Sequence, residues 1–326
     1  MGEFELIRRH FQRAPAPAGD SAVVLGIGDD CALLQPSPGH QLAISSDMLV
    51  EGRHFFADVD PEALGHKALA VNLSDLAAMG ARPLGFTLAL ALPHADSDWL
   101  ARLARGLFAL ADAHACPLVG GDTTRGPLNL CLTVFGEVRP GQALRRDAAR
   151  AGDDLYVSGR TGEARLALEQ LRGTGWAGTA VAAEARARLE RPTPRNALGQ
   201  SLAAVAGAHA AIDLSDGLAG DLGHILQASG VGAEIHLPDL PVAPLLRALP
   251  EAHRLECLLA GGDDYELLFT AAPEAREAIA QASAASGTSV TRIGRITADA
   301  GLRLLDAAGQ PRPFLARSFD HFAPSA

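Results

Sequence analysis

Apolar residues follow two different periods in the first half of the chain. Short apolar runs predict strands, at residues 23–27, 42–45, 84–92 and 128–138. Leucines spaced three and four residues apart predict an amphipathic helix over 99–114. Another helix is expected to begin at Asp60-Pro61-Glu62, which combines a capping side chain, a proline at the first helical position and an acid in the first turn. We expect that helix to end near Gly80.

The second half mixes strands and helices in the same way. Apolar runs predict strands at 155–157, 210–212, 265–270 and 290–296. Alanine-rich segments predict helices at 163–171, 180–189, 196–205 and 272–282. A further helix should follow Asp216, whose side chain is expected to cap it.

This order of elements predicts an α/β or α+β fold. A chain of 326 residues is long for a single hydrophobic core, so two domains are expected. The polar segment 139–151 contains Pro140-Gly141 and is the candidate boundary. We therefore expect an N-terminal domain over 1–140 and a C-terminal α/β domain over 141–326.

Composition excludes several classes of function. Hydrophobic residues make up 48% of the chain and charged residues 20%, which is typical of a soluble globular protein. The net charge of -10 argues against a general nucleic-acid binder. Because no apolar stretch resembles a signal peptide or reaches membrane-spanning length, we expect a cytoplasmic protein without membrane contact. The four cysteines form no C-x-x-C pair and are interpreted as reduced core residues.

Aspartates recur beside small residues near the ends of the predicted strands. The clusters are Gly28-Asp29-Asp30, Ser45-Ser46-Asp47, Gly120-Gly121-Asp122, Asp213-Leu214-Ser215-Asp216 and Gly261-Gly262-Asp263-Asp264. One such aspartate is usually only a cap or turn residue, but a turn does not require the repeated pairs. Carboxylate and hydroxyl oxygens without a His/Cys cluster favour magnesium or manganese over zinc. Since there are more carboxylates than one ion needs, we expect several ions.

The chain lacks the lysine motif that commonly binds the phosphates of a nucleotide. Lys67 is the only lysine, and alanine follows it, so the chain has no G-x-x-x-x-G-K-[ST] phosphate loop. A nucleotide would have to be bound by aspartates, metal ions and arginine. Of Arg145 and Arg146, one is expected to be solvated surface and the other to meet phosphate. For His54 a hydrogen-bonded histidine beside Phe55 and a ligand-binding side chain remain equal alternatives.

Taken in order, these motifs resemble the thiamine-monophosphate kinase family, within the aminoimidazole-ribonucleotide-synthetase-like proteins. The resemblance rests on Gly28-Asp29-Asp30-Cys31-Ala32, Ser45-Ser46-Asp47 with His54-Phe55, Asn72-Leu73-Ser74-Asp75, Gly120-Gly121-Asp122-Thr123, Asp213-Leu214-Ser215-Asp216-Gly217, Gly261-Gly262-Asp263-Asp264-Tyr265-Glu266 and Phe319-Asp320-His321-Phe322. It implies two α/β domains, of which the first, over 1–140, binds ATP and metal and the second, over 141–326, completes the active site. It also implies a homodimer formed by pairing of the N-terminal sheets, and transfer of the ATP γ-phosphoryl group to thiamine monophosphate.

The resemblance also implies roles for individual residues. The implied magnesium ligands are Asp30, Ser45, Ser46, Asp47, Asp75, Asp122, Asp213 and Asp216. The implied ATP contacts are Gly121, Asp122, Arg146 and Ser215, and those to thiamine monophosphate are His54, Asp263 and Phe319. The family usually has glutamate where this chain has Asp263. No covalent nucleophile is implied. An ionised phosphate acceptor needs no strong base, so we expect direct transfer with ATP as co-substrate.

Three alternatives are weighed against this interpretation. A selenophosphate synthetase would need a reactive cysteine with a nearby lysine close to the N-terminus, whereas the first cysteine here is Cys31 in an apolar run. A hydrogenase-maturation relative would be expected to end in cysteine, and this chain ends in Ala326. An inactive nucleotide-binding regulator would not need the full set of motif aspartates.

Overall fold

A computed structural model describes residues 2–13, 22–175 and 182–313 of the chain. The chain divides into two compact units. Unit 1 comprises Met1–Leu76 and Ala81–Ala143, and unit 2 comprises Ala77–Gly80 and Leu144–Ala326. None of the described helices is both long enough and apolar enough to cross a membrane.

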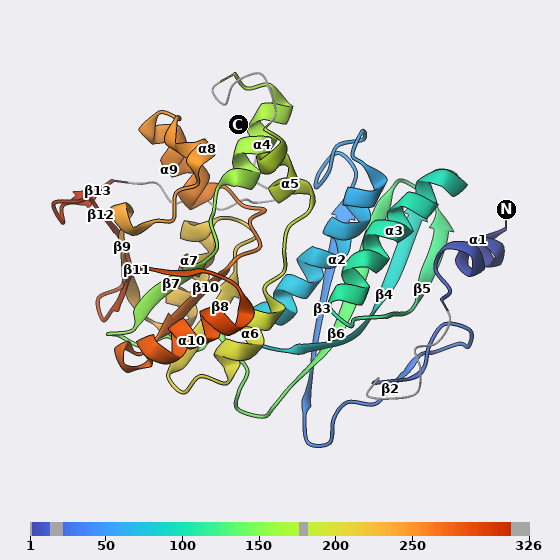
Figure 1. The fold of residues 1–326 in the computed structure, drawn as a ribbon, viewed down its shortest axis with the longest axis horizontal. Coiled ribbons are helices and arrows are strands. Elements are labelled where there is room, and N and C mark those ends of the chain that lie inside the picture. Colours follow the sequence, from blue (N-terminus) through green and yellow to red (C-terminus); the bar gives the residue numbers. More distant parts are fainter. Residues whose placement is uncertain (1, 14–21, 176–181, 314–326) are drawn as a thin grey trace. The chain divides into compact units, whose positions relative to one another are not determined.

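Unit 1 is built on a four-stranded sheet in the order β3-β6-β4-β5. Its strands are β3 (Gln41–Val50), β4 (Arg82–Leu92), β5 (Leu118–Arg125) and β6 (Asn129–Val138). β4 and β5 run parallel, and the other pairs are antiparallel. Helices α2 (Pro61–Ala78) and α3 (Ser97–Ala113) lie across one face of this sheet (Figure 1). The short elements α1 (Glu3–His10), β1 (Val23–Leu25) and β2 (Leu33–Leu34) complete the unit.

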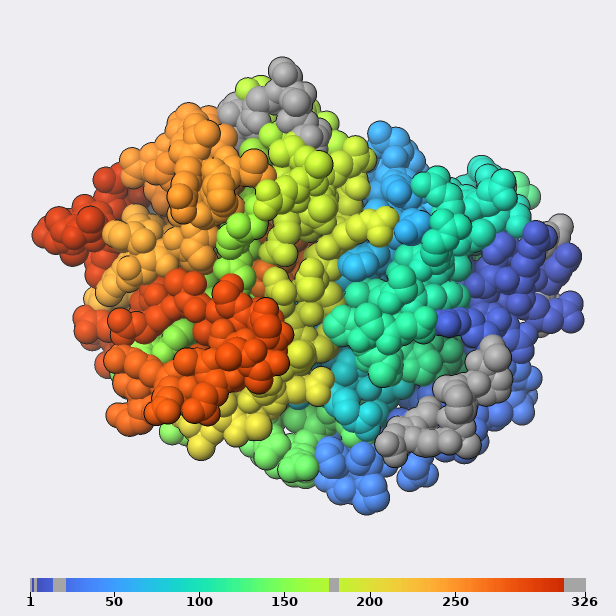
Figure 2. All heavy atoms as spheres, in the orientation of Figure 1, coloured from blue at the N-terminus to red at the C-terminus, as the bar shows by residue number. Residues whose placement is uncertain are grey.

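Two glycines let α2 and α3 pack closely. A Cβ atom on Gly65 of α2 would lie 2.1 Å from the Leu103 carbonyl oxygen, and one on Gly106 of α3 would lie 1.8 Å from the Glu62 carbonyl oxygen. The two helix backbones are therefore in direct contact, with their buried leucines against the sheet. The outer side of α3 belongs to the molecular surface (turquoise in Figure 2).

Unit 2 is built on a seven-stranded sheet in the order β13-β12-β9-β11-β7-β10-β8. Its strands are β7 (Asp154–Ser158), β8 (Ala208–Asp213), β9 (Gly232–His236), β10 (Leu267–Ala271), β11 (Val290–Thr297), β12 (Gly301–Leu305) and β13 (Pro311–Arg312). Only β9 and β12 pair in parallel among these described strands.

Helices cover both faces of this second sheet (Figure 1). One face packs against α4 (Glu163–Arg172), α5 (Ala183–Glu190), α7 (Leu218–Ser229), α8 (Pro244–Arg247) and α9 (Glu251–Ala260). The other packs against α6 (Asn196–Ala203) and α10 (Arg276–Ser286). Successive residues of a central strand alternate between the two cores, as Leu155 and Tyr156 of β7 do. This alternation explains why the central strands are apolar on both sides.

Three expectations about these elements were wrong. β3 does not stop at Ser45, because its pairing with β6 continues to Val50. The Gly120-Gly121-Asp122 motif does not follow a strand but lies within β5. The four cysteines are free thiols, as expected, but only Cys116 and Cys257 are buried, since Cys31 is exposed and Cys131 half-buried.

Candidate functional site

A pair of side chains joins the edge strand of unit 1 to helix α2. The Ser45 hydroxyl donates to Asp75 Oδ2 at 2.5 Å. Two residues along β3, the backbone N–H of Asp47 donates to Asn72 Oδ1 at 3.0 Å. Asn72 is fully buried, and its amide nitrogen donates to the Ala68 carbonyl within α2. The strand therefore presents Ser45 and Asp47 on the face that carries α2, beside Asp75.

Ser46 points to the opposite face of the same strand, since successive side chains alternate. Its hydroxyl donates to the Leu132 carbonyl at 2.9 Å and lies 3.0 Å from the Thr133 hydroxyl on β6. The structure does not bring the Ser46 side chain to Ser45, Asp47 and Asp75. Ser46 can contribute to that group only through its main-chain atoms.

Asp30 and Asp122 occupy two further positions of unit 1. Asp30 lies in the exposed turn after Ile27, where its backbone N–H donates to Asp29 Oδ1 at 2.8 Å. Asp122 lies on β5, where it is exposed and paired with Ala89 of β4. Gly121 beside it has a positive φ of 146°, and a Cβ atom there would lie 1.9 Å from the Leu88 carbonyl oxygen. Strand packing therefore already requires glycine at position 121.

The oxygen ligands of unit 1 fit a hard cation that is only partly enclosed by protein. Within residues 2–13, 22–175 and 182–313, no three His, Cys, Asp or Glu side chains converge closely enough to hold a metal ion by themselves. Magnesium suits such a site, because it keeps several waters and takes the rest of its ligands from a few carboxylates and substrate phosphates. The donor set of aspartates and a serine contains none of the soft ligands that would favour zinc.

His54 follows β3 and is hydrogen-bonded to its last residue. Its Nδ1 atom accepts a hydrogen bond from the Val50 backbone N–H at 2.9 Å. The neutral ring therefore carries its proton on Nε2. The hydrogen-bonded alternative for this histidine is confirmed, and its contact with a ligand stays a prediction.

In unit 2, strand β8 ends at Asp213 and leads into the Ser215-Asp216-Gly217 turn. Asp216 was expected to cap α7, but that prediction was wrong, because Gly217 is the capping residue and no side chain caps it. Instead Asp221, inside the first turns of α7, accepts from the backbone N–H groups of Asp216 and Gly217 at 3.1 Å each. The turn is therefore held by Asp221, a residue of the helix itself, and the Asp216 carboxylate does not cap the helix.

Burial and, to a lesser extent, the nearby Asp216 carboxylate raise the pKa of Asp221 to about 7, although hydrogen bonds from backbone N–H groups act in the opposite direction. Sequence reasoning missed Asp221 as part of this loop. The only feature of the sequence that could have indicated this role is the position of Asp221 about one turn into the helix.

The Gly261–Glu266 segment follows α9 and packs against this turn. The backbone N–H of Asp263 donates to the Ser215 carbonyl at 2.8 Å, and that of Tyr265 donates to the Leu214 carbonyl at 2.8 Å. Asp263 and Tyr265 have φ values of 59° and 49°, in the left-handed region that non-glycine residues seldom adopt. The two loops thus form one hydrogen-bonded unit with Asp263 partly exposed on it.

The two candidate arginines are both exposed but differ in their ion pairs. Arg145 is exposed and paired with Asp147, with its Nε atom 2.9 Å from Oδ1. The exposed Arg146 side chain makes no ion pair with any residue that the structure describes, and its carbonyl accepts from Ser229. Arg146 is therefore the one available to an anionic ligand. Phe319, the third expected substrate contact, lies outside the described residues.

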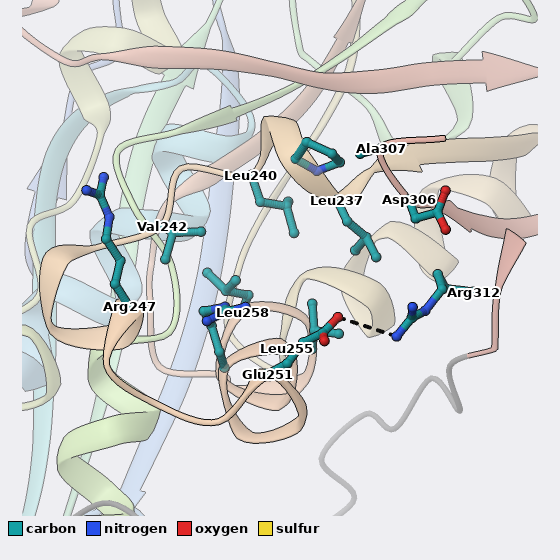
Figure 3. A pocket seen from close by; sticks show the side chains of 12 residues that line it. Leu237, Leu240, Val242, Arg247, Glu251, Leu255, Leu258, Asp306, Ala307 and Arg312 are labelled. Atoms are coloured by element: carbon teal, nitrogen blue, oxygen red, sulfur yellow. Dashed lines mark hydrogen bonds and ion pairs between the residues drawn. The ribbon is translucent and has the colours of Figure 1, made fainter. Parts of the chain in front are cut away.

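A pocket of ≈ 470 Å³ lies elsewhere in unit 2. Its apolar wall comes from Leu237, Leu240, Val242, Leu255 and Leu258 (Figure 3). At its rim Arg312 pairs with Glu251 at 3.4 Å. None of the residues expected to bind metal, ATP or acceptor lines it, so this pocket does not define the candidate site.

Comparison with known proteins identifies both halves of the chain. The family described as AIR synthase related protein, N-terminal domain, matches residues 28–138, and the corresponding C-terminal domain matches residues 150–306. Thiamine-monophosphate kinase of Salmonella typhimurium is 46% identical over 99% of this chain and 98% of its own length. That of Escherichia coli K12 is 45% identical with the same coverage. The chain belongs to the thiamine-monophosphate kinase family.

Solved structures of this family share the fold. Thiamine-monophosphate kinase from Stenotrophomonas maltophilia K279a superposes with a TM-score of 0.81 at 48% identity, over 87% of this chain and 92% of that one. AaThiL complexed with AMPPCP and TMP superposes with a TM-score of 0.76 at 30% identity, over 88% and 89%. The hydrogenase maturation protein HypE of E. coli has a TM-score of 0.77 at only 23% identity and shares the fold alone. The expected family and its two-domain α/β architecture are confirmed.

Proposed function

We propose that this member of the thiamine-monophosphate kinase family transfers the γ-phosphoryl group of ATP to thiamine monophosphate, giving thiamine diphosphate and ADP. The observation that carries the proposal is the structural similarity, over 88% of this chain, to a relative complexed with AMPPCP and TMP, an ATP analogue and the acceptor. The 46% identical relative named for this activity supports the same reaction.

We propose that the motif aspartates bind magnesium ions. In unit 1 these are Asp30, Asp47, Asp75 and Asp122 together with Ser45, and in unit 2 they are Asp213 and Asp216. Bound magnesium ions would neutralise polyphosphate charge and orient the phosphates. The Ser45 hydroxyl orients the Asp75 carboxylate, and Asn72 fixes the backbone at Asp47. The chain thus contributes negative oxygen ligands whose directions are set by their own hydrogen bonds.

The chemical step is proposed to be direct and in line. The phosphate of thiamine monophosphate is ionised near neutral pH, so no side chain has to remove a proton from it. The protein has to hold two anions together, which needs positive charge in a chain whose net charge is -10. The exposed Arg146 side chain is assigned to the phosphates of ATP, together with Gly121 and Ser215. Asp263 and His54 are assigned to the acceptor.

We also propose a homodimer formed through the uncovered face of the unit 1 sheet. Leu42, Ile44 and Met48 of β3 are 51%, 61% and 51% exposed, and they lie on the face opposite α2. An apolar row of this kind on an uncovered strand is typical of an interface. Light scattering should give twice the chain mass, and Ile44→Glu should give a monomer. A wild-type monomer at micromolar concentration would refute the dimer.

The reaction is tested by separating thiamine phosphates after incubation with ATP, magnesium and thiamine monophosphate. Thiamine diphosphate should form only when all three are present, and the Asp75→Asn variant should form very little. Binding of ATP without turnover would instead support the inactive regulator. Turnover of ATP with a different acceptor would support another member of the superfamily.

A further inference from the structure

The Gly261–Glu266 segment ends in a buried carboxylate that the proposed reaction does not use. Glu266 is fully buried and immediately precedes β10, whose residues are all buried and mostly apolar. Its Oε1 atom lies 2.6 Å from Arg188 Nη2, and both carboxylate oxygens bond to Arg195, at 2.6 Å and 2.7 Å. The Ser158 hydroxyl completes the set at 2.6 Å from Oε2.

The turn at Gly159 packs closely against the Glu266 carboxylate. A Cβ atom on Gly159, whose φ is 53°, would lie 2.1 Å from Glu266 Oε1, so glycine in the neighbouring turn leaves space for the carboxylate. Burying an ion pair in place of apolar side chains gives little or no net stability. Stability alone therefore does not account for a paired glutamate at this position, next to the segment that carries Asp263.

That segment is strained on both sides of Asp264. Asp263 and Tyr265 adopt left-handed φ values, while the buried Asp264 between them accepts from the Gly162 N–H through both oxygens, at 2.8 Å and 3.0 Å. Residues in such conformations persist only where the surroundings fix them. Asp264 fixes the middle of the segment, and Glu266 fixes the end that joins it to β10.

We propose that Glu266 is a positioning residue for the acceptor: its ion pairs with Arg188 and Arg195 hold the backbone that directs the Asp263 carboxylate to thiamine monophosphate. This inference rests on the proposed function and on the assignment of Asp263 to the acceptor. Loss of the ion pairs lets the segment shift where it joins β10, which misdirects the Asp263 carboxylate and weakens acceptor binding. The hydrogen bonds from the segment to Leu214 and Ser215 are made by backbone atoms and survive that loss.

The test is Arg195→Lys, which keeps the positive charge but loses the two-pronged contact with Glu266. Its KM for thiamine monophosphate should rise at least tenfold, while its KM for ATP stays within twofold of the wild-type value. Arg276→Lys is the matched control, because Arg276 makes the same two-pronged contact with the buried Asp154 of unit 2, at 2.6 Å and 2.9 Å. The control should change neither KM.

A double-mutant cycle separates positioning from a merely structural role. In an Asp263→Ala background, Arg195→Lys should raise the KM for thiamine monophosphate no further, because the carboxylate that it positions is gone. Arg188→Lys, which affects a single hydrogen bond to Glu266, replaces Arg195→Lys in the same cycle if the latter does not fold.

Several outcomes overturn the inference. These are an unchanged KM for thiamine monophosphate, an equal rise in both KM values, the same rise in the Asp263→Ala background, or an equal effect of Arg276→Lys. A wild-type protein without thiamine diphosphate formation would overturn the proposed function instead. Normal KM values in Asp263→Ala alone would overturn the assignment of Asp263.

Discussion

Replacing Ser45 and Ser46 one at a time by alanine should have very different consequences for turnover. The Ser45 hydroxyl donates to the Asp75 carboxylate at 2.5 Å, and a hydrogen bond to a charged group contributes roughly 1.5–3 kcal/mol. If that bond orients Asp75 in the transition state, Ser45→Ala should lower kcat/KM by roughly 10- to 150-fold. The Ser46 hydroxyl instead contacts Cys131, Leu132 and Thr133 of β6, away from Asp75, so Ser46→Ala should change kcat/KM by less than about threefold.

The assay couples ADP formation to a spectrophotometric readout at saturating magnesium, with either substrate varied. Thermal melting of both variants serves as the control, because each loses one hydroxyl from the same strand. An equal loss of activity in the two variants would refute the argument from the two faces of β3. Full activity of Ser45→Ala would refute the role of the Ser45 to Asp75 bond.

Four other outcomes are expected. Excess chelator should abolish turnover, and Asp75→Asn should lower it by roughly 10² to 10³-fold, since a lost metal-site interaction is worth about 3–4 kcal/mol; full activity in chelator would contradict this. Intact-protein mass spectrometry after mixing with ATP alone should find no phosphate on the chain, and a kinetically competent gain of one phosphate would exclude direct transfer. Asp263→Ala should raise the KM for thiamine monophosphate by the equivalent of roughly 1.5–3 kcal/mol and spare that for ATP, while Asp263→Glu should be tolerated; weakened ATP binding with normal acceptor binding would reverse the assignment. Burial raises the pKa of Glu137, but hydrogen bonds from Ser37 and Arg82 outweigh it and hold that pKa below 4.5. This stabilisation is present at neutral pH and is lost as pH falls through the lowered pKa; Arg82→Ala should therefore cost roughly 1–2 kcal/mol in urea unfolding at pH 7 and less at pH 3, and a cost that does not depend on pH would contradict it.

The pattern of apolar residues predicted most of the central elements of the fold. The helix from Pro61 and the strands around Leu88 and Val157 depend on local caps and on burial on both faces, which the sequence displays. β9 and β12 were missed, because each is a five-residue strand, and β9 pairs with β11 and β12, which lie far from it in the chain. Local propensity carries little information about such strands.

The motifs indicated the candidate site, but not its geometry. Serine and aspartate favour turns, so β3 was expected to end at Ser45, and only its pairing with β6 places Ser45 and Ser46 on opposite faces. The side-chain contacts that hold the unit 2 loops could not be predicted from the sequence either. Arg195 and Glu266 are 71 residues apart in the chain and meet only because α6 and β10 pack in the same unit.

The central claim is that the phosphoryl group passes directly from ATP to thiamine monophosphate, and its most direct test is the stereochemical course at phosphorus. ATP made chiral at its γ-phosphorus with oxygen isotopes is incubated with thiamine monophosphate and magnesium, and the configuration of the terminal phosphate of thiamine diphosphate is determined. A single in-line transfer predicts inversion. Retention of configuration, or release of the label as inorganic phosphate without thiamine diphosphate, would contradict the account.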